Sequence, residues 1–458
     1  METVHPSRGR PPLPDGPFLV VGLARSGVSA ARALAFRGEQ VTGVDAGHPS
    51  DLTGLDDASV PYFLDEEGLD RLDGVRTVVK SPGVPQDAAV VSEARTRGIE
   101  VIGELELGWR MVEAPFLAVT GTNGKTTTTE LAAHLFRAAG RPVEAVGNVG
   151  KPLTALAIES EPGATVVCEC SSFQLEDTSA FAPECAVFLN LAPDHLDRYT
   201  DFDAYGKAKL RIFRNQVEGD LAVLNLGDRW LADQEIPGAA RRVGFLPPGE
   251  GDGDGVADVR VAGGEIEVEG RPLLPVDEVG LIGPHNVANA MAAAAATLGF
   301  GLPEESVAEG LAGFTGVAHR LEPVGELDAG RWVKDSTATT VTATLTALAS
   351  FSGGIRLILG GRGKGEDYAA LADPVAESCV AVYLVGENAD EIGSALGASG
   401  VELVRSSDLS AAVDAAARAS RPGETVLLSP AAASFDQFRD FEERGDRFRS
   451  LVGALDAS

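Results

Sequence analysis

Residues 116–126 constrain the fold of this chain more than any other stretch. They read Phe-Leu-Ala-Val-Thr-Gly-Thr-Asn-Gly-Lys-Thr, an apolar run of strand type followed by a glycine-rich turn. An amphipathic stretch of helical type, Thr127 to Ala139, comes next. Such a turn directs backbone N–H groups and a helix N-terminus at one point, which suits a phosphate group. The pattern therefore predicts a nucleotide-binding α/β domain in which Lys125 supplies a cation and Thr126 can ligate Mg²⁺.

The match to the general phosphate-binding loop is incomplete, because Val119 stands where that pattern has its first glycine. The alternative is an ordinary strand–turn–helix with a surface lysine. The preceding strand and the following helix favour nucleotide binding. We expect the phosphates of the bound nucleotide to be contacted by Gly121, Thr122, Asn123, Gly124, Lys125, Thr126 and Thr127.

A second glycine turn lies near the start of the chain. Residues 18–23 are predicted as a strand that runs into Gly22–Gly27, a helix is predicted at 28–37, and a strand at 40–44 ends at Asp45. Ala24 replaces the middle glycine of the dinucleotide fingerprint. The pattern leaves two possibilities open, a dinucleotide fold or a Rossmann-like fold that holds another diphosphate.

The length and charge of the chain bound its organisation. A chain of 458 residues is too long for one core, so several domains are expected. The net charge of −30 argues against a nucleic-acid surface and against binding to anionic membranes. An anionic substrate would then require a local basic site. We also expect a disordered Pro-rich tail at 1–17, no membrane insertion, a cytoplasmic location, and four reduced, mostly buried cysteines.

Polar residues follow several predicted strands of the central region. Lys80-Ser81-Pro82-Gly83 follows a predicted strand at 77–79, which is where open α/β sheets bind ligands. Glu169 follows the predicted strand at 165–168 and is expected to ligate nucleotide Mg²⁺. His195 lies in the loop after the predicted strand at 185–189, where a structural and a functional role are equally open.

Two predicted helices carry further candidates. The helix at 202–213 bears Lys207, Lys209 and Arg211, whose simplest interpretation is a solvated basic face. Asn286 and Asn289 share one face of a later helix. Two amides in this arrangement can read a purine edge; the alternative is a helix cap with a polar neighbour.

A third α/β unit is predicted from His319-Arg320 onward. Its strands are expected at 332–334, 355–359, 380–385, 402–404 and 425–428, mostly with helices between them. The fold class is therefore α/β with three domains: an N-terminal Rossmann-like domain at 18–112, a central ATPase-like domain with a small added β region at 113–317, and a C-terminal Rossmann-like domain at 318–458.

Taken together and in order, these motifs resemble those of the Mur ligase family, over about Phe18 to Phe448. The resemblance rests on Thr120–Thr126, Glu169–Gln174, Asp194–Tyr199, Ala208–Arg211, His285–Asn289 and His319-Arg320. The stretch Leu428 to Phe438 is similar to members that add D-glutamate to UDP-N-acetylmuramoyl-L-alanine.

The resemblance implies an ATP-dependent amide ligase, expected to be a monomer. The first domain would hold the UDP part of the substrate, the second ATP, and the third would close over both and bring glutamate. Two Mg²⁺ ions are expected.

The resemblance also implies roles for individual residues. The implied catalytic residues are Lys125, His195, Lys209 and Lys364, with Lys209 carbamylated. The implied metal ligands are Thr126, Glu169, His195 and Lys209. Further ATP contacts are implied for Asn286, Asn289, Arg320 and Asp335. The implied substrate contacts are Arg25, Ser26, Asp45, Ser81, Asn148, Ser171, Gln174, His195, Thr339, Lys364, Ser434 and Phe441.

The chain departs from the family pattern in the third domain. Thr337 and Thr340 stand where a lysine and an asparagine are usual, and Arg362 stands where a related enzyme has an aspartate. These changes bear on the acceptor, so an L-glutamate ligase is an alternative.

Three further functions compete. A folylpolyglutamate-type ligase usually lacks an N-terminal UDP domain. An NAD-dependent oxidoreductase leaves Lys125 and Asn286/Asn289 unexplained. A non-catalytic nucleotide-binding protein would not turn over ATP.

Overall fold

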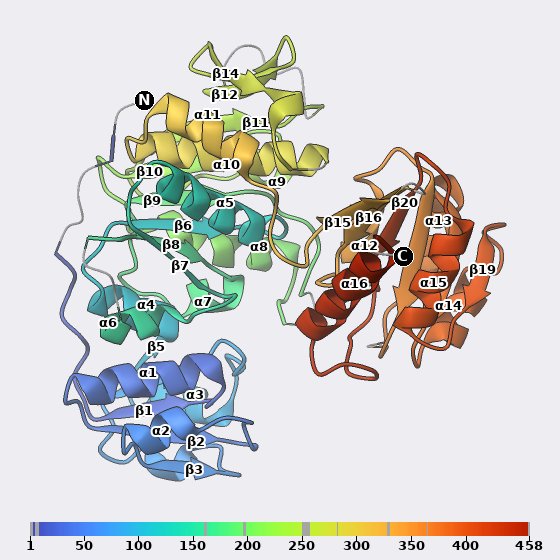
Figure 1. Ribbon diagram of the computed structural model, residues 1–458. Coiled ribbons are helices and arrows are strands. Elements are labelled where there is room, and N and C mark those ends of the chain that lie inside the picture. Colours follow the sequence, from blue (N-terminus) through green and yellow to red (C-terminus); the bar gives the residue numbers. More distant parts are fainter. Residues whose placement is uncertain are drawn as a thin grey trace. The chain divides into compact units, whose positions relative to one another are not determined.

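The computed structural model describes residues 3–4, 9–159, 163–195, 198–249, 257–281, 283–327, 330–363 and 365–456. The chain divides into two compact units, residues 1–279 with 287–313, and residues 280–286 with 314–458. Within the described residues, the first unit contains two sheets and the second contains one (Figure 1). The α/β class predicted from the sequence is confirmed.

The N-terminal domain is a parallel sheet of five strands within the described residues, in the order β3-β2-β1-β4-β5. Apolar side chains cover both faces, with α1 and α4 packed on one and α3 on the other. Burial on both faces explains the apolar runs of β1 and β4. The elements are β1 (Phe18–Val21), α1 (Arg25–Phe36), β2 (Val41–Asp45), α2 (Thr53–Asp57), β3 (Tyr62–Leu64), η1 (Leu69–Arg71), β4 (Thr77–Lys80), α3 (Ala89–Thr96), β5 (Glu100–Gly103) and α4 (Glu104–Met111).

Two details of this domain differ from the prediction. Helix α1 begins at Arg25, three residues before the predicted start, because the turn ends at the N-cap residue Ala24 and the last residues of the glycine pattern are already helical. The segment predicted as a disordered tail makes ordered contacts at Arg10, whose buried guanidinium lies 3.1 Å from Glu184 and donates to the carbonyl of Ala114.

The central domain is a sheet of nine strands within its described residues, in the order β14-β13-β12-β11-β10-β9-β6-β8-β7. Strands β7 to β12 pair in parallel and β12 to β14 pair antiparallel, as the alternating pattern at 259–268 predicted. The predicted loop at 249–255 lies mostly outside the described residues. The elements are β6 (Phe116–Thr120), α5 (Lys125–Ala138), β7 (Val143–Gly147), η2 (Leu153–Ala155), α6 (Leu156–Glu159), β8 (Thr165–Glu169), α7 (Ser172–Glu176), β9 (Cys185–Phe188), α8 (Phe202–Leu210), η3 (Arg211–Phe213), β10 (Leu221–Asn225), α9 (Arg229–Ala232), β11 (Arg241–Leu246), β12 (Val259–Ala262), β13 (Glu265–Val268), β14 (Arg271–Pro275), η4 (Val276–Glu278), α10 (Pro284–Gly299) and α11 (Glu304–Gly313).

Strand β6 lies between β8 and β9, and all three run in parallel. Their carboxyl ends therefore bring the glycine turn, Glu169 and the loop at Asn190 to one edge of the sheet. The four cysteines are free and buried, with the sulfur atoms of Cys168 and Cys170 3.9 Å apart, as expected.

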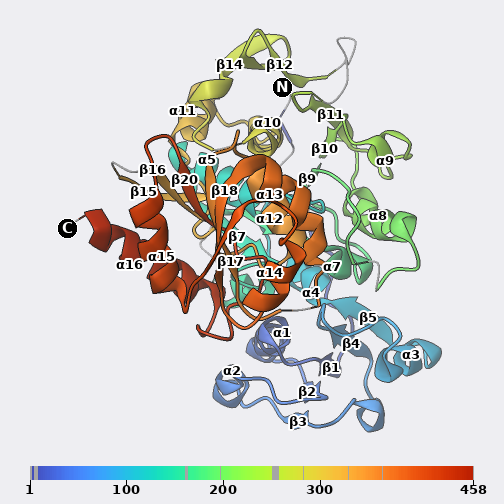
Figure 2. The same ribbon diagram turned by 90° about the vertical axis from the view of Figure 1, so that its right-hand side faces the viewer.

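The C-terminal domain has a sheet in the order β15-β16-β20-β17-β18-β19, in which β15 alone is antiparallel among the described strands. One face packs against α12 to α14 and the other against α15 and α16, which flank the strands in Figure 2. The elements are β15 (Glu322–Leu327), β16 (Gly330–Lys334), α12 (Val341–Leu348), β17 (Ile355–Gly360), η5 (Tyr368–Leu371), α13 (Ala372–Ser378), β18 (Cys379–Val385), α14 (Ala389–Ala395), β19 (Glu402–Arg405), α15 (Leu409–Ala419), β20 (Thr425–Leu428) and α16 (Phe441–Asp456).

No helix in the described part of the chain is both long and apolar enough to span a bilayer.

Candidate active site

The glycine turn between β6 and α5 is tightly packed. Gly121 and Gly124 have φ angles of 150° and 83°, which a residue with a side chain rarely adopts. A Cβ atom on Gly124 would lie 2.3 Å from Oδ1 of Asn289, so the Asn289 amide rests against this turn. The Lys125 ammonium donates to the carbonyl of Thr122 at 2.8 Å, which folds the lysine over the turn it follows.

The loop after β9 braces this turn through Asn190, a residue that the sequence reasoning missed. Its Oδ1 accepts from the Asn123 N–H at 2.9 Å, its Nδ2 donates to the Asn123 carbonyl at 3.0 Å, and its own carbonyl accepts from the Thr122 N–H at 2.9 Å. The position of Asn190 just past a central strand was the available signal. Thr122 is also bound to the same loop, since its hydroxyl accepts from the Ala192 N–H at 3.0 Å.

Glu169 ends β8 with a side chain that is almost fully buried. One carboxylate oxygen accepts from the Thr126 hydroxyl at 2.8 Å and the other from Nδ2 of Asn148 at 3.0 Å. A buried carboxylate beside a threonine hydroxyl at the end of a phosphate-binding turn is an oxygen donor set that suits Mg²⁺. These residues fit the metal that the sequence predicted.

Lys209, near the end of α8, points into the same region. Its side chain is buried, its Nζ donates to the carbonyl of Gly121 at 2.7 Å, and it lies 4.6 Å from the ring centroid of Tyr205. Burial lowers the pKa of this amine well below its ordinary value, the Lys125 cation lowers it further, and the carboxylates of Asp194 and Glu169 oppose the shift. The structure thus corrects the simplest interpretation of Lys209 as part of a solvated face.

His195 occupies a left-handed backbone position, with φ of 53°. Its Nε2 lies 3.5 Å from the Asp194 carboxylate and its ring centroid 4.8 Å from that of Phe173, with about half of the side chain exposed. The next two residues of the motif, Leu196 and Asp197, lie outside the described residues. The roles of His195 in metal and substrate binding stay predictions.

The N-terminal glycine turn is held by the side chains of its neighbours. Asp45 accepts from the Leu23 N–H at 2.6 Å and from the Gly47 N–H at 2.8 Å. The Ser81 hydroxyl donates to the carbonyl of Gly22 at 2.6 Å. Asp45 and Ser81 therefore fix the backbone of the turn. The direct substrate contacts that the resemblance implied for them stay predictions.

The remaining substrate candidates of this unit are more exposed or serve the backbone. Arg25 is exposed and donates to the carbonyl of Gly150 at 2.9 Å, and Ser26 is half-buried in the first turn of α1. Ser171 and Gln174 form a capping box at the start of α7, in which the Gln174 amide oxygen accepts from the Ser171 N–H at 3.0 Å. This contact engages the Gln174 oxygen in the helix end.

In the second unit, Asp335 organises the loop that follows β16. Its carboxylate accepts from the hydroxyls of Ser429 and Thr337, at 3.0 and 3.3 Å. Burial raises the pKa of this carboxyl, and the Arg320 cation opposes the shift. Asn286 is buried and is the last residue of the segment 280–286, which belongs to this unit. Burial lowers the pKa of the neighbouring His285, and the Arg320 cation lowers it further.

Two of the predicted acceptor residues, Thr339 and Ser434, lie on two loops that Arg444 joins. This buried arginine donates to the carbonyls of Ser336 and Ala432 at 2.9 and 3.0 Å, and the Ser336 hydroxyl donates to the carbonyl of Phe441 at 2.7 Å. Ser434 is buried. Arg444 had no motif to identify it in the sequence.

Two other acceptor candidates have more open surroundings, and one cannot be placed. Thr339 is half-buried. Arg362 is exposed, and its guanidinium makes two contacts of 3.1 Å with the Glu387 carboxylate. Lys364 lies outside the described residues.

Three family models match the chain in succession. Residues 17–103 match the model described as Mur ligase MurD-like, N-terminal domain, residues 119–297 the Mur ligase middle domain, and residues 319–432 the Mur ligase, glutamate ligase domain. The UDP-N-acetylmuramoylalanine–D-glutamate ligase of Salinibacter ruber is 42% identical over 453 residues, covering 95% of this chain and 97% of that protein. The ligase of the same name from Geobacter metallireducens is 44% identical over 449 residues, with 96% and 97% covered.

Solved structures agree on the fold. The UDP-N-acetylmuramate-alanine ligase of Thermotoga maritima has a TM-score of 0.58 at 20% identity and covers 96% of this chain and 99% of its own. The FolC protein of E. coli has a TM-score of 0.53 at 19% identity but covers 75% of this chain and 89% of its own. The N-terminal match disfavours the folylpolyglutamate-type alternative. From its first strand to its glutamate ligase domain, this chain belongs to the Mur ligase family.

Proposed function

We propose that the protein joins D-glutamate to UDP-N-acetylmuramoyl-L-alanine at the expense of ATP. The observation that carries this proposal is the cluster at the end of β6, where Lys125, Glu169 and the buried Lys209 surround the glycine turn. The family membership and the names of the two relatives support the same reaction. The cytoplasmic location and the monomeric state stay predictions.

The first step activates a carboxylate. An oxygen of the alanine carboxylate forms a bond to the γ-phosphorus of ATP, the bond to the β-phosphate oxygen breaks, and ADP leaves. Lys125 and the N–H groups of the turn offset the charge that moves onto the phosphate oxygens. The second step forms the amide: the glutamate amine attacks the acyl carbon, loses a proton, and inorganic phosphate leaves.

Mg²⁺, when bound, would supply further positive charge at the phosphates. Thr126 and Glu169 would hold one ion. We propose a second ion on Lys209, whose neutral amine can add CO₂ and release a proton to give an anionic carbamate. The lowered pKa of Lys209 favours this, because the unprotonated amine is the form that reacts.

The substrate contacts divide between the domains. The exposed Arg25 and the half-buried Ser26 at the N-terminal turn would meet the UDP part, on a backbone fixed by Asp45 and Ser81. Asn148 and His195 would meet the muramoyl-alanine end. For ATP, the family resemblance assigns Asn286 to the adenine with Asn289 nearby, Arg320 to the phosphates and Asp335 to the ribose.

The glutamate would be held in the C-terminal domain by Thr339, Lys364, Ser434 and the backbone near Phe441. Two anchored carboxylates fix the side of the α-carbon on which the amine stands. The opposite enantiomer would then present a hydrogen where nitrogen must attack, which should reduce its rate strongly.

The test is phosphate release with ATP, UDP-N-acetylmuramoyl-L-alanine and D-glutamate, omitting one substrate at a time. We expect release only with all three, and an ADP-to-amide ratio of one. Phosphate release at the same rate with and without the UDP substrate would contradict the proposal.

A further inference from the structure

One buried residue of the central domain, Asp177, contacts several residues of the N-terminal domain. Asp177, just after α7, is almost fully buried and has Lys80 Nζ 2.9 Å from its Oδ2. Its Oδ1 accepts from Gln86 Nε2 at 2.8 Å and lies 3.8 Å from the Arg95 guanidinium. Its backbone carbonyl accepts from the Gly103 N–H at 2.9 Å. All four partners precede α4, and all four therefore belong to the N-terminal domain.

The partners of Asp177 also shape the turns proposed to bind UDP. Lys80 ends β4, and its Nζ donates to the Val84 carbonyl at 2.8 Å, which closes the turn that follows the strand. The same turn contains Ser81, whose hydroxyl holds the carbonyl of Gly22. Asp177 thus acts on the first glycine turn through two intervening residues.

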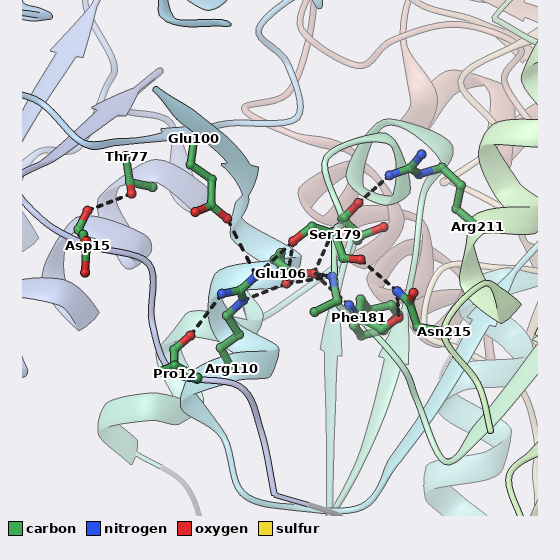
Figure 3. A network of polar contacts seen from close by, with 12 residues as sticks. Pro12, Asp15, Thr77, Glu100, Glu106, Arg110, Ser179, Phe181, Arg211 and Asn215 are labelled. Atoms are coloured by element: carbon green, nitrogen blue, oxygen red, sulfur yellow. Dashed lines mark hydrogen bonds and ion pairs between the residues drawn. The ribbon is translucent and has the colours of Figure 1, made fainter. Parts of the chain in front are cut away.

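The segment around Asp177 is also held by two further side chains, Glu106 and Arg211. Glu106, fully buried on α4, accepts from three successive backbone N–H groups at residues 179–181, at 2.9 to 3.1 Å (Figure 3). Arg211 donates to the carbonyls of Leu175 and Thr178. The end of α7 is therefore hydrogen-bonded both to α4 and to the segment that follows α8.

The end of α7 is continuous with the residues of the proposed ATP chemistry. Helix α7 begins shortly after Glu169, and Arg211 follows Lys209 by two positions along the chain. We propose that Asp177 is a positioning residue: from the domain that carries Glu169 and Lys209, it holds the UDP-binding turns of the N-terminal domain in the conformation that binds the substrate. This inference rests on the proposed function.

A buried ion pair need not stabilise a fold more than apolar residues of the same size would, although removing one partner leaves a costly unpaired charge. A purely structural pair would affect stability without selecting a substrate. Breaking a positioning pair should instead weaken the binding of the UDP substrate and leave the binding of ATP unchanged.

The experiment compares Asp177→Asn, Lys80→Met and the double variant with the parent enzyme. Asp177→Asn should raise the KM for the UDP substrate about tenfold, with the KM for ATP and the kcat at saturation within about twofold. The double variant should be no worse than the poorer single variant, because each single change already breaks the pair. Glu66→Gln is the control, since it breaks the 2.9 Å ion pair with Arg71 within the N-terminal domain and should leave all constants unchanged.

Amide hydrogen exchange of the free proteins gives a readout that needs no turnover. Asp177→Asn should increase exchange in residues 80–86 and leave residues 121–128 as in the parent. If Asp177→Asn does not fold, Gln86→Leu, which removes one of the contacts, takes its place in both measurements. If the variant kept the parent's KM for the UDP substrate and the parent's amide exchange at residues 80–86, the inference would be overturned. A parent enzyme that ignores the UDP substrate would overturn the proposed function instead, and the exchange result would still decide whether Asp177 orders the turn.

Discussion

The two glycine turns of the first unit have the same strand–turn–helix form and different surroundings. The turn at Gly22–Gly27 follows β1 and is held by the side chains of Asp45 and Ser81, with Arg25 exposed at its edge. The turn at Gly121–Thr126 follows β6 and contacts two lysines, Lys125 from within and the buried Lys209 from α8.

The backbone form of a glycine turn alone therefore does not decide what the turn does. Both turns lead into the N-terminus of a helix, an end that can bind an anion. The second turn also lies beside two lysines and the Glu169 carboxylate. Transfer of a phosphoryl group requires such charged groups, because negative charge shifts during the reaction. We therefore expect the first turn to bind a substrate and the second to perform chemistry.

Lys125→Ala should give the largest effect. Loss of one preorganised charge at the transferring phosphate should lower kcat by a factor of about 10² to 10³. Binding of the UDP substrate should stay at the parent value, measured by calorimetry. Arg137→Ala, an exposed residue at the far end of α5, is the control. A folded Lys125→Ala enzyme with near-parent turnover would remove the functional distinction between the turns.

Lys209→Ala should come next, with a loss of up to about 100-fold in kcat, as when a group that supports a metal is removed. A short carboxylic acid at high concentration should restore part of the rate, because it can replace the carbamate. Lys207→Ala is the matched control, since this exposed lysine of the same helix pairs with Asp203. Parent turnover by Lys209→Ala, with bicarbonate removed from both enzymes, would exclude the carbamate.

Asp45→Asn should affect the first turn alone. Two backbone N–H groups lose a charged acceptor, so the KM for the UDP substrate should rise about tenfold while kcat at saturation is kept. Steady-state kinetics in each substrate measure this. Asp51→Asn, at an exposed site that binds Thr53, should change nothing. A lowered kcat with an unchanged KM would place Asp45 in the chemistry and not in substrate binding.

Thr337→Lys should give the smallest effect and extends the comparison to the acceptor. The Thr337 hydroxyl donates to the His319 carbonyl and to Asp335 within its own loop. A lysine there should lower the KM for D-glutamate about threefold, the scale of one solvent-accessible ion pair, with the constants for ATP and the UDP substrate unchanged. The assay also compares L-glutamate. An unaltered KM would mean that the missing charge does not limit acceptor binding.

Local pattern predicted the strand–turn–helix at 116–138 and the carboxylate at the end of β8, because each signal lies within a short stretch of chain. The burial of Lys209 and its bond to Gly121 could not be predicted from its helix, since they depend on how α8 packs against a turn 88 residues earlier. Arg444 and Ser336 are 108 residues apart, and Asp177 and Gln86 are 91 apart. Contacts of this kind leave no periodicity in the sequence.

Short edge elements were also missed for a physical reason. Strand β3 is half-buried on all three residues, so it lacks the apolar run of β1 and the alternation of a one-sided strand. Asn190 was visible at a strand end, but its role as a brace depends on the turn of a neighbouring strand.

The division of labour between the two turns is tested most directly by equilibrium binding without turnover. Calorimetry would measure the Kd of a non-hydrolysable ATP analogue and of UDP-N-acetylmuramoyl-L-alanine separately for the parent, Lys125→Ala and Asp45→Asn. We expect Lys125→Ala to weaken binding of the ATP analogue alone and Asp45→Asn to weaken binding of the UDP substrate alone, each by about tenfold or more. If either variant weakened the other ligand instead, or both ligands equally, the two turns would not have the separate roles assigned to them.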